Sequence, residues 1–255
     1  MSFSLYQEFY KLSHKKIPWI MPLLLLVLMV FMGLVYPSQY GNLMVMTSYN
    51  TSDWILIILV ITSSTLFSME FQNNTILTLV YKAPNKLYVY LSKLIVMFAY
   101  NVILHVLSMI FTALLILTPI NKPVSWMATY QYHQPLVVNM FATTGVDLIT
   151  SLLIISLIFF MSCLINSNSL VITLNIAIIF MGSYASSDLL NNSSKLASLV
   201  KWNPLNMINL TTQYYSYAVT RGFTMLSNLQ LLIGAAGYSL FFLVVGYLIF
   251  RKKRF

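Results

Sequence analysis

The stretch EFQNNTILTLVYKAPNKLYVYLSK, residues 70–93, is the longest polar interruption in the first half of a very apolar chain. Near its middle, a short apolar run follows Asn74 and Thr75, residue types that can cap a helix N-terminus. The run is followed by Pro84, which cannot continue a helix. The stretch therefore predicts a helix of one to two turns at the membrane surface, then a turn, then a new helix that enters the membrane near Lys93.

The composition indicates a membrane protein. The 255 residues are 59% hydrophobic and only 7% charged, with a mean hydropathy of +0.80, whereas a soluble domain has roughly 25% charged residues. The five acidic residues are Glu8, Asp53, Glu70, Asp147 and Asp188. So few carboxylates and a single cysteine argue against a metal site and exclude an intramolecular disulfide. The net charge of +9 comes mostly from residues near span ends, so we expect no nucleic-acid partner.

Six segments approach the ~20 apolar residues that a helix needs to cross a bilayer core of about 30 Å. They are about 18–36, 54–69, 94–117, 146–165, 170–187 and 229–250. We therefore predict an all-α polytopic membrane protein with one domain, 1–255, and six transmembrane helices. The amphipathic residues 1–17 predict a helix in the membrane interface. No small-residue cleavage site follows the first span, so we expect that span to be a permanent anchor.

The basic residues predict the orientation, because they are enriched in cytoplasmic segments. With both termini in the cytoplasm, the cytoplasmic segments carry ten of the 14 basic residues and the outer segments carry four. The ten are Lys11, Lys15, Lys16, Lys82, Lys86, Lys93, Arg251, Lys252, Lys253 and Arg254, and the four are Lys122, Lys195, Lys201 and Arg221. We therefore predict cytoplasmic termini. Of the outer segments, 37–52, 118–145 and 188–228, the last contains a Tyr-rich part, 204–220, that predicts helices at the outer leaflet.

Motifs for catalysis are absent from the sequence. It contains no phosphate-binding G-x-x-x-x-G-K-[ST], no H-E-x-x-H and no G-x-S-x-G, so we do not expect this chain to be an enzyme. Three polar residues fall inside predicted spans: Asn101 and His105, which share a helix face, and Asn175. They indicate either a substrate path or interhelical hydrogen bonds worth ~0.6 kcal/mol each, and we favour the second reading.

Across residues 70–93, the order of residues resembles the first cytoplasmic loop of ABC-2-type transporter permeases. In that family the loop forms a coupling helix that docks on a separate ATPase subunit. The positions that the resemblance assigns to coupling are Glu70, Asn74, Thr75, Leu77, Leu79, Pro84, Lys86 and Lys93. Asn74 stands where the family usually has Gly, a mild departure because Asn tolerates left-handed backbone. The alternative is an ordinary positively charged loop that carries a surface helix.

The resemblance implies a permease subunit of an ATP-driven exporter in a bacterial cytoplasmic membrane. It also implies two ATPase copies, which would bind the ATP and Mg, a second permease chain, and re-entrant outer helices between spans five and six. No cofactor is expected on this chain. We expect amphipathic or hydrophobic cargo, and first among such cargo peptides such as a bacteriocin, lantibiotic or cytolytic toxin. The alternative is a non-transporting membrane sensor or immunity protein that binds a peptide through residues 188–228.

Overall fold

The computed structural model describes residues 2–73, 75–82, 85–118, 124–192 and 197–253. Six helices in this part of the chain are long and apolar enough to cross a membrane. They are α2 (Ile17–Val35), α4 (Thr51–Gln72), α6 (Lys86–Ile116), α7 (Leu136–Leu164), α8 (Asn168–Asn192) and α13 (Asn228–Lys252). The predicted all-α fold with six spans is therefore confirmed.

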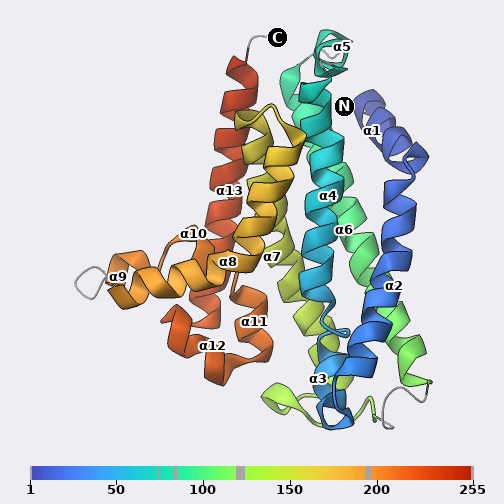
Figure 1. The fold of residues 1–255 in the computed structure, drawn as a ribbon, viewed down its shortest axis with the longest axis vertical. Coiled ribbons are helices and arrows are strands. Elements are labelled where there is room, and N and C mark those ends of the chain that lie inside the picture. Colours follow the sequence, from blue (N-terminus) through green and yellow to red (C-terminus); the bar gives the residue numbers. More distant parts are fainter. Residues whose placement is uncertain (1, 74, 83–84, 119–123, 193–196, 254–255) are drawn as a thin grey trace.

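The shorter helices gather at the two ends of the bundle. One end, called here the α5 end, holds α1 (Ser2–His14), α5 (Thr75–Lys82) and the last turns of α13 (Figure 1). The opposite end, called the α3 end, holds α3 (Gly41–Met46) and two 3-10 turns, Ser38–Tyr40 and Gln131–His133. Between α8 and α13 the chain forms α9 (Ala197–Val200), α10 (Pro204–Met207), α11 (Leu210–Tyr215) and α12 (Tyr217–Thr224).

The core is built around α7, which packs against α4, α6, α13 and the short helix α11. An aromatic group fills the junction of four spans, with Phe67 stacked on Phe159 at 4.8 Å between ring centroids and Tyr90 and Phe250 alongside. A Cβ at Gly246 would lie 2.9 Å from Tyr90 Oη. Glycine at this position therefore lets α13 approach the other spans closely.

Two span starts differ from the sequence prediction. The third span was predicted to begin near residue 94, but α6 begins at Lys86 because the Asn85 side chain accepts a hydrogen bond from Leu87 N. The fourth was predicted from residue 146, but α7 begins at Leu136, directly after Pro135. The last ten residues of the predicted outer segment 118–145 are therefore helix. An apolar window marks only the part of a helix that is apolar enough for the hydrocarbon core, and a helix can begin several residues earlier.

The fifth span does not run straight. Figure 1 shows α8 descending beside α4 and then turning sideways toward α9, so its two parts run in different directions. The lateral part and α10 to α12 form a layer at the α3 end against α7 and α13. Local capping shapes this layer, because the Asn203 side chain accepts from Asn206 N at the start of α10, and a Ser227–Gln230 capping box starts α13.

Candidate functional site

Four charged residues form a buried cluster at the α5 end, here called the charge cluster. Lys93 Nζ lies 2.8 Å from Glu8 Oε2 and 2.6 Å from Glu70 Oε2. Lys11 Nζ lies 2.8 Å from Glu8 Oε1 and 2.9 Å from Glu70 Oε1. Each carboxylate therefore contacts both ammonium groups, and the cluster joins α1, α4 and α6.

Burial explains why all four charges belong together. The Lys93 side chain is 0% exposed and the Glu8 side chain 1% exposed, and a buried charge is costly unless it is paired and hydrogen-bonded. Two positive and two negative charges sum to zero, so the cluster places no net charge in the bundle. Lys93 Nζ also lies 3.4 Å from the Leu66 carbonyl oxygen. Removing one member would leave a buried charge without compensation.

The electrostatics of α1 follow from the same contacts. Burial raises the pKa of Glu8, but the charges of Lys93 and Lys11 outweigh burial and hold this pKa below its ordinary value. Burial lowers the pKa of Lys11, but Glu70 and Glu8 outweigh it and raise this pKa above its ordinary value. Both groups are therefore stabilised in their charged forms.

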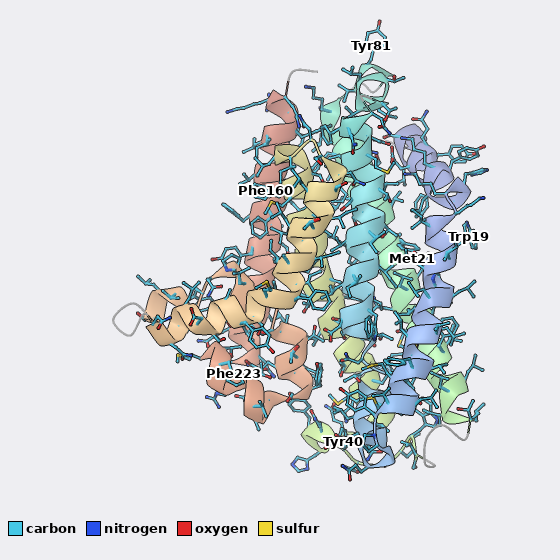
Figure 2. All side chains as sticks on the ribbon, viewed as in Figure 1. Trp19, Met21, Tyr40, Tyr81, Phe160 and Phe223 are labelled. Carbon is cyan, nitrogen blue, oxygen red and sulfur yellow. The ribbon has the colours of Figure 1, made fainter. Side chains whose placement is uncertain are left out.

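Helix α5, the predicted coupling helix, has one buried face and one exposed face. Ile76 is 1% exposed and belongs to the main hydrophobic cluster, and Leu79 and Val80 pack against that cluster. On the other face Leu77 is 41% exposed and Tyr81 is 93% exposed. Figure 2 shows Tyr81 pointing away from the body of the protein. The helix is thus anchored on one side and presents apolar groups on the other.

Between α1 and α5 lies a hollow of about 300 Å³. Tyr6, Tyr10 and Lys11 line it from α1, and Thr78 and Leu79 line it from α5. Tyr6 is 69% exposed and Tyr10 is 53% exposed. Exposed aromatic side chains beside a hollow are characteristic of protein interaction surfaces. This surface adjoins the charge cluster, because Lys11 belongs to both.

Lys86, another predicted coupling residue, contacts the last turn of α13. Its Nζ donates to the carbonyl oxygens of Arg251 and Lys253 at 3.1 and 2.9 Å. A cation at a helix C-terminus is favoured by the unpaired carbonyl groups there. Lys253 Nζ in turn donates to the Cys163 carbonyl oxygen at 3.1 Å. The start of α6 is therefore fastened to the ends of α13 and α7.

Of the remaining predicted coupling positions, Thr75 lies within the described residues, whereas Asn74 and Pro84 do not. Thr75 Oγ1 donates to the Glu70 carbonyl oxygen at 3.5 Å. Sequence reasoning missed Glu8 and Lys11 as partners of the loop. Their signal was available, because every buried charge in so apolar a chain needs an opposite charge nearby.

A second buried polar group, here called the His105 cluster, lies between spans. His105 Nε2 is 2.9 Å from Asp147 Oδ2, and Asn101 Nδ2 donates to Ser151 Oγ at 2.7 Å. Thr211 Oγ1 of α11 donates to Asp147 Oδ1 at 2.9 Å. Asn101 and His105 therefore make interhelical hydrogen bonds, and the cluster joins α6, α7 and α11.

Asn175, the third polar residue predicted inside a span, bonds within its own helix. Asn175 Nδ2 donates to the Val171 carbonyl oxygen of its own helix at 2.7 Å. Sequence reasoning missed Asp147 and Ser151, although they are four residues apart, as Asn101 and His105 are, on neighbouring antiparallel spans. That matched spacing was the available signal. Within the described ranges, no group of three His, Cys, Asp or Glu residues could hold a metal ion.

The chain was compared with known proteins. A search of curated proteins found no match. The family model described as "ABC-2 family transporter protein" matches residues 4–182, which is more than half of the chain. The matched range contains most of α1, all of α5, all four members of the charge cluster and the paired residues of α6 and α7. The chain therefore belongs to the ABC-2 family of transporter proteins.

Proposed function

We propose that this chain is the permease subunit of an ATP-driven exporter, and that the α5 end docks on a separate ATPase subunit. Permeases of this family normally pair with an ABC ATPase. The observation that carries the proposal is the charge cluster, in which Glu70 and Lys93 flank α5, contact each other, and pair with Lys11 and Glu8 of α1, respectively. A push on α5 is therefore transmitted to α1, α4 and α6 together.

Docking would use the exposed face of α5 and the adjoining hollow. Leu77 and Tyr81 are exposed there, as are Tyr6 and Tyr10 of α1. Glu70 and Lys93 have a different role in this proposal, because they are too buried to meet a partner. They hold the docking surface on the spans, as positioning residues. Nucleotide would then bias two positions of α5, and the spans would follow.

The proposed orientation places the α5 end in the cytoplasm. Support comes from the ten basic residues assigned to that side and the four assigned to the other. In this arrangement two ATPase copies, with their ATP and Mg, would bind two permease chains, identical or of two kinds, in a bacterial cytoplasmic membrane. Nothing in this arrangement requires catalysis by the permease itself.

The proposed cargo is amphipathic or hydrophobic, with membrane-active peptides as the first class to test. The 15 Met, 16 Phe and 17 Tyr residues supply flexible and aromatic surface that suits such molecules. Cargo would be sought by measuring which peptides stimulate ATP hydrolysis once the permease and its ATPase are reconstituted together in nanodiscs.

The test is recovery of the ATPase with the permease from native membranes in mild detergent, identified by mass spectrometry. We expect a Walker-type ATPase in roughly equal amount. Tyr81→Asp should reduce that recovery at least tenfold while the permease accumulates normally. Tyr40→Asp is the matched control, because Tyr40 is also exposed but lies at the α3 end (Figure 2). Recovery of the wild-type chain without an ATPase, or equal recovery from both variants, would refute the docking proposal.

A further inference from the structure

A cavity of about 410 Å³ lies between α4, α7, α8, the short helix α11 and the two residues before it, Ile208 and Asn209. It is near the α3 end, because the first turn of α4 supplies Ser52 and Asp53 to its wall. Its volume falls in the usual range for small-molecule sites, about 300–1,000 Å³. The cavity is thus distinct from the docking surface at the α5 end, and it contains two of the chain's five acidic residues, Asp53 and Asp147.

The charge of Asp147 is already balanced. His105 Nδ1 lies 2.9 Å from the Asn101 carbonyl oxygen, which only accepts, so Nδ1 carries a proton. His105 Nε2 faces Asp147 Oδ2 at 2.9 Å, and a second proton must lie between these two atoms. Whichever atom holds it, the His105–Asp147 pair has no net charge. The pair therefore contributes polarity to the wall, and no charge.

Asp53, in contrast, has no cationic partner among the described residues that line the cavity. Its Oδ2 accepts one hydrogen bond, at 2.8 Å, from the neutral amide of Asn50, and the side chain is exposed. It stands in the first turn of α4, where the helix dipole favours an anion. The cavity therefore has one carboxyl group, that of Asp53, with which a cationic ligand could pair.

The rest of the wall combines apolar and aromatic side chains with Ser, Thr and Asn side chains. Leu56 and Ile57 of α4 face the cavity on one side, and Ile179 and Phe180 of α8 line it on another. Trp54, the residue directly after Asp53, also lines the cavity and adds an aromatic ring. Aromatic faces attract cations, and apolar walls attract hydrocarbon. This one cavity therefore offers both aromatic side chains for a cation and apolar side chains for a hydrocarbon group.

We propose that this cavity binds an amphipathic cation, with its ammonium group at Asp53 and its apolar body between α4 and α8. The volume suits an aromatic amine, or one cationic end of a peptide whose remainder stays outside. Only one part of this proposal, that the bound cation is transported cargo, rests on the proposed function. Binding itself requires no ATPase.

The test measures binding to the full chain in lipid nanodiscs without an ATPase. The probe is 4-fluorophenethylamine, observed by ¹⁹F NMR line broadening, with 2-(4-fluorophenyl)ethanol as its neutral counterpart and empty nanodiscs for subtraction. We expect saturable binding of the amine, at least tenfold tighter than binding of the alcohol. Equal binding of the two probes would overturn the proposal.

Two variants and a control locate the site. Asp53→Asn should weaken amine binding at least tenfold and leave alcohol binding unchanged. Asp188→Asn is the matched control, because Asp188 is also exposed and also accepts from an asparagine, Asn192, but does not line the cavity. Ser183→Trp fills the cavity and should weaken both probes. Unchanged amine binding in either Asp53→Asn or Ser183→Trp would overturn the site.

These outcomes are separable from those of the docking test. Absence of saturable amine binding together with normal ATPase recovery would refute the ligand-binding proposal for the cavity and leave the docking proposal standing. Failure to recover an ATPase with normal amine binding would refute the docking proposal and leave the cavity as a ligand site.

Discussion

The two buried polar clusters of this permease differ in how their carboxylates are paired. In the charge cluster, Glu8 and Glu70 each meet two lysines, and the four formal charges cancel within a closed group. In the His105 cluster, Asp147 meets one histidine and one threonine and lines a cavity. The comparison teaches that a closed set of charges serves to fasten helices, whereas a balanced pair beside open space leaves a polar wall available to a ligand.

The largest expected effect comes from breaking the closed cluster. Lys93→Met leaves two buried carboxylates with only Lys11, so the free energy of unfolding should fall by about 3–5 kcal/mol, the usual result of removing one partner from a buried ion pair. Unfolding in detergent, followed by tryptophan fluorescence, measures this change. Lys16→Met is the control, because Lys16 lies at the same end but is exposed. Equal stabilities of the two variants would show that the cluster does not hold the spans together.

Acid should weaken the charge cluster in a defined window. The folded-state pKa of Glu8 lies below its ordinary value of 4.5, so its contribution to stability is present above about pH 4.5 and is lost as the pH falls through the folded pKa. Lys11 has a raised pKa, so its contribution is present below its ordinary value of 10.5 and is lost only above the folded pKa. The unfolding midpoint should therefore be insensitive to these two groups near neutral pH and should fall in acid.

A comparison with Lys93→Met tests whether the fall of the unfolding midpoint in acid, here called the acid step, comes from the charge cluster or from other groups. The acid step should be smaller in Lys93→Met, because Glu8 there has lost the first of the charges that lower its pKa. An acid step of the same size in both proteins would assign it to other groups.

A smaller effect is expected when the His105 cluster is broken. Asp147→Ala leaves His105 and Thr211 without their shared partner and should lower the free energy of unfolding by about 1–3 kcal/mol, the cost of unpaired buried polar groups. Asp188→Ala, at an exposed carboxylate, should change it by about 0.5 kcal/mol or less. A loss for Asp147→Ala as large as that for Lys93→Met would contradict the distinction between the two clusters.

The smallest effect on stability is expected at the docking surface. Tyr81→Ala should change the free energy of unfolding by no more than about 0.5 kcal/mol, because the side chain is 93% exposed. The same unfolding assay, run beside ATPase recovery, checks it. A marked destabilisation would mean that Tyr81 packs against the permease and is unavailable to a partner.

The sequence predicted the parts of this fold that depend on local pattern. Apolar length predicted the six spans, and the run bounded by Thr75 and Pro84 predicted α5, which the structure places at Thr75–Lys82. It could not predict that Glu70 and Lys93 are buried. That burial depends on α1 folding back onto α6, with Glu8 and Lys93 separated by 85 positions. Contacts between distant segments leave no periodic signal.

The lateral turn of α8 likewise could not be predicted from mean hydropathy in a window of residues. A window records how apolar residues 170–187 are, and a helix lying along the membrane can be as apolar as one crossing it. The cavity depends on this turn, because α8 and α11 both supply its walls. Asp53 was identified only as one of five rare acids, and its role needed the arrangement of several helices.

The turn of α8 also has a consequence for the surrounding lipid. With 31 residues at about 1.5 Å rise each, α6 is roughly 46 Å long, well beyond a hydrocarbon core of about 30 Å. On the side of α8, only the part before the turn runs along the bundle (Figure 1). Lipids there meet a shorter apolar wall than lipids beside α6, so the bilayer is expected to thin locally. Reconstitution in lipids of increasing acyl-chain length should therefore perturb the α3 end, with its cavity, before it perturbs the charge cluster, and hydrogen exchange at the two ends would reveal that order.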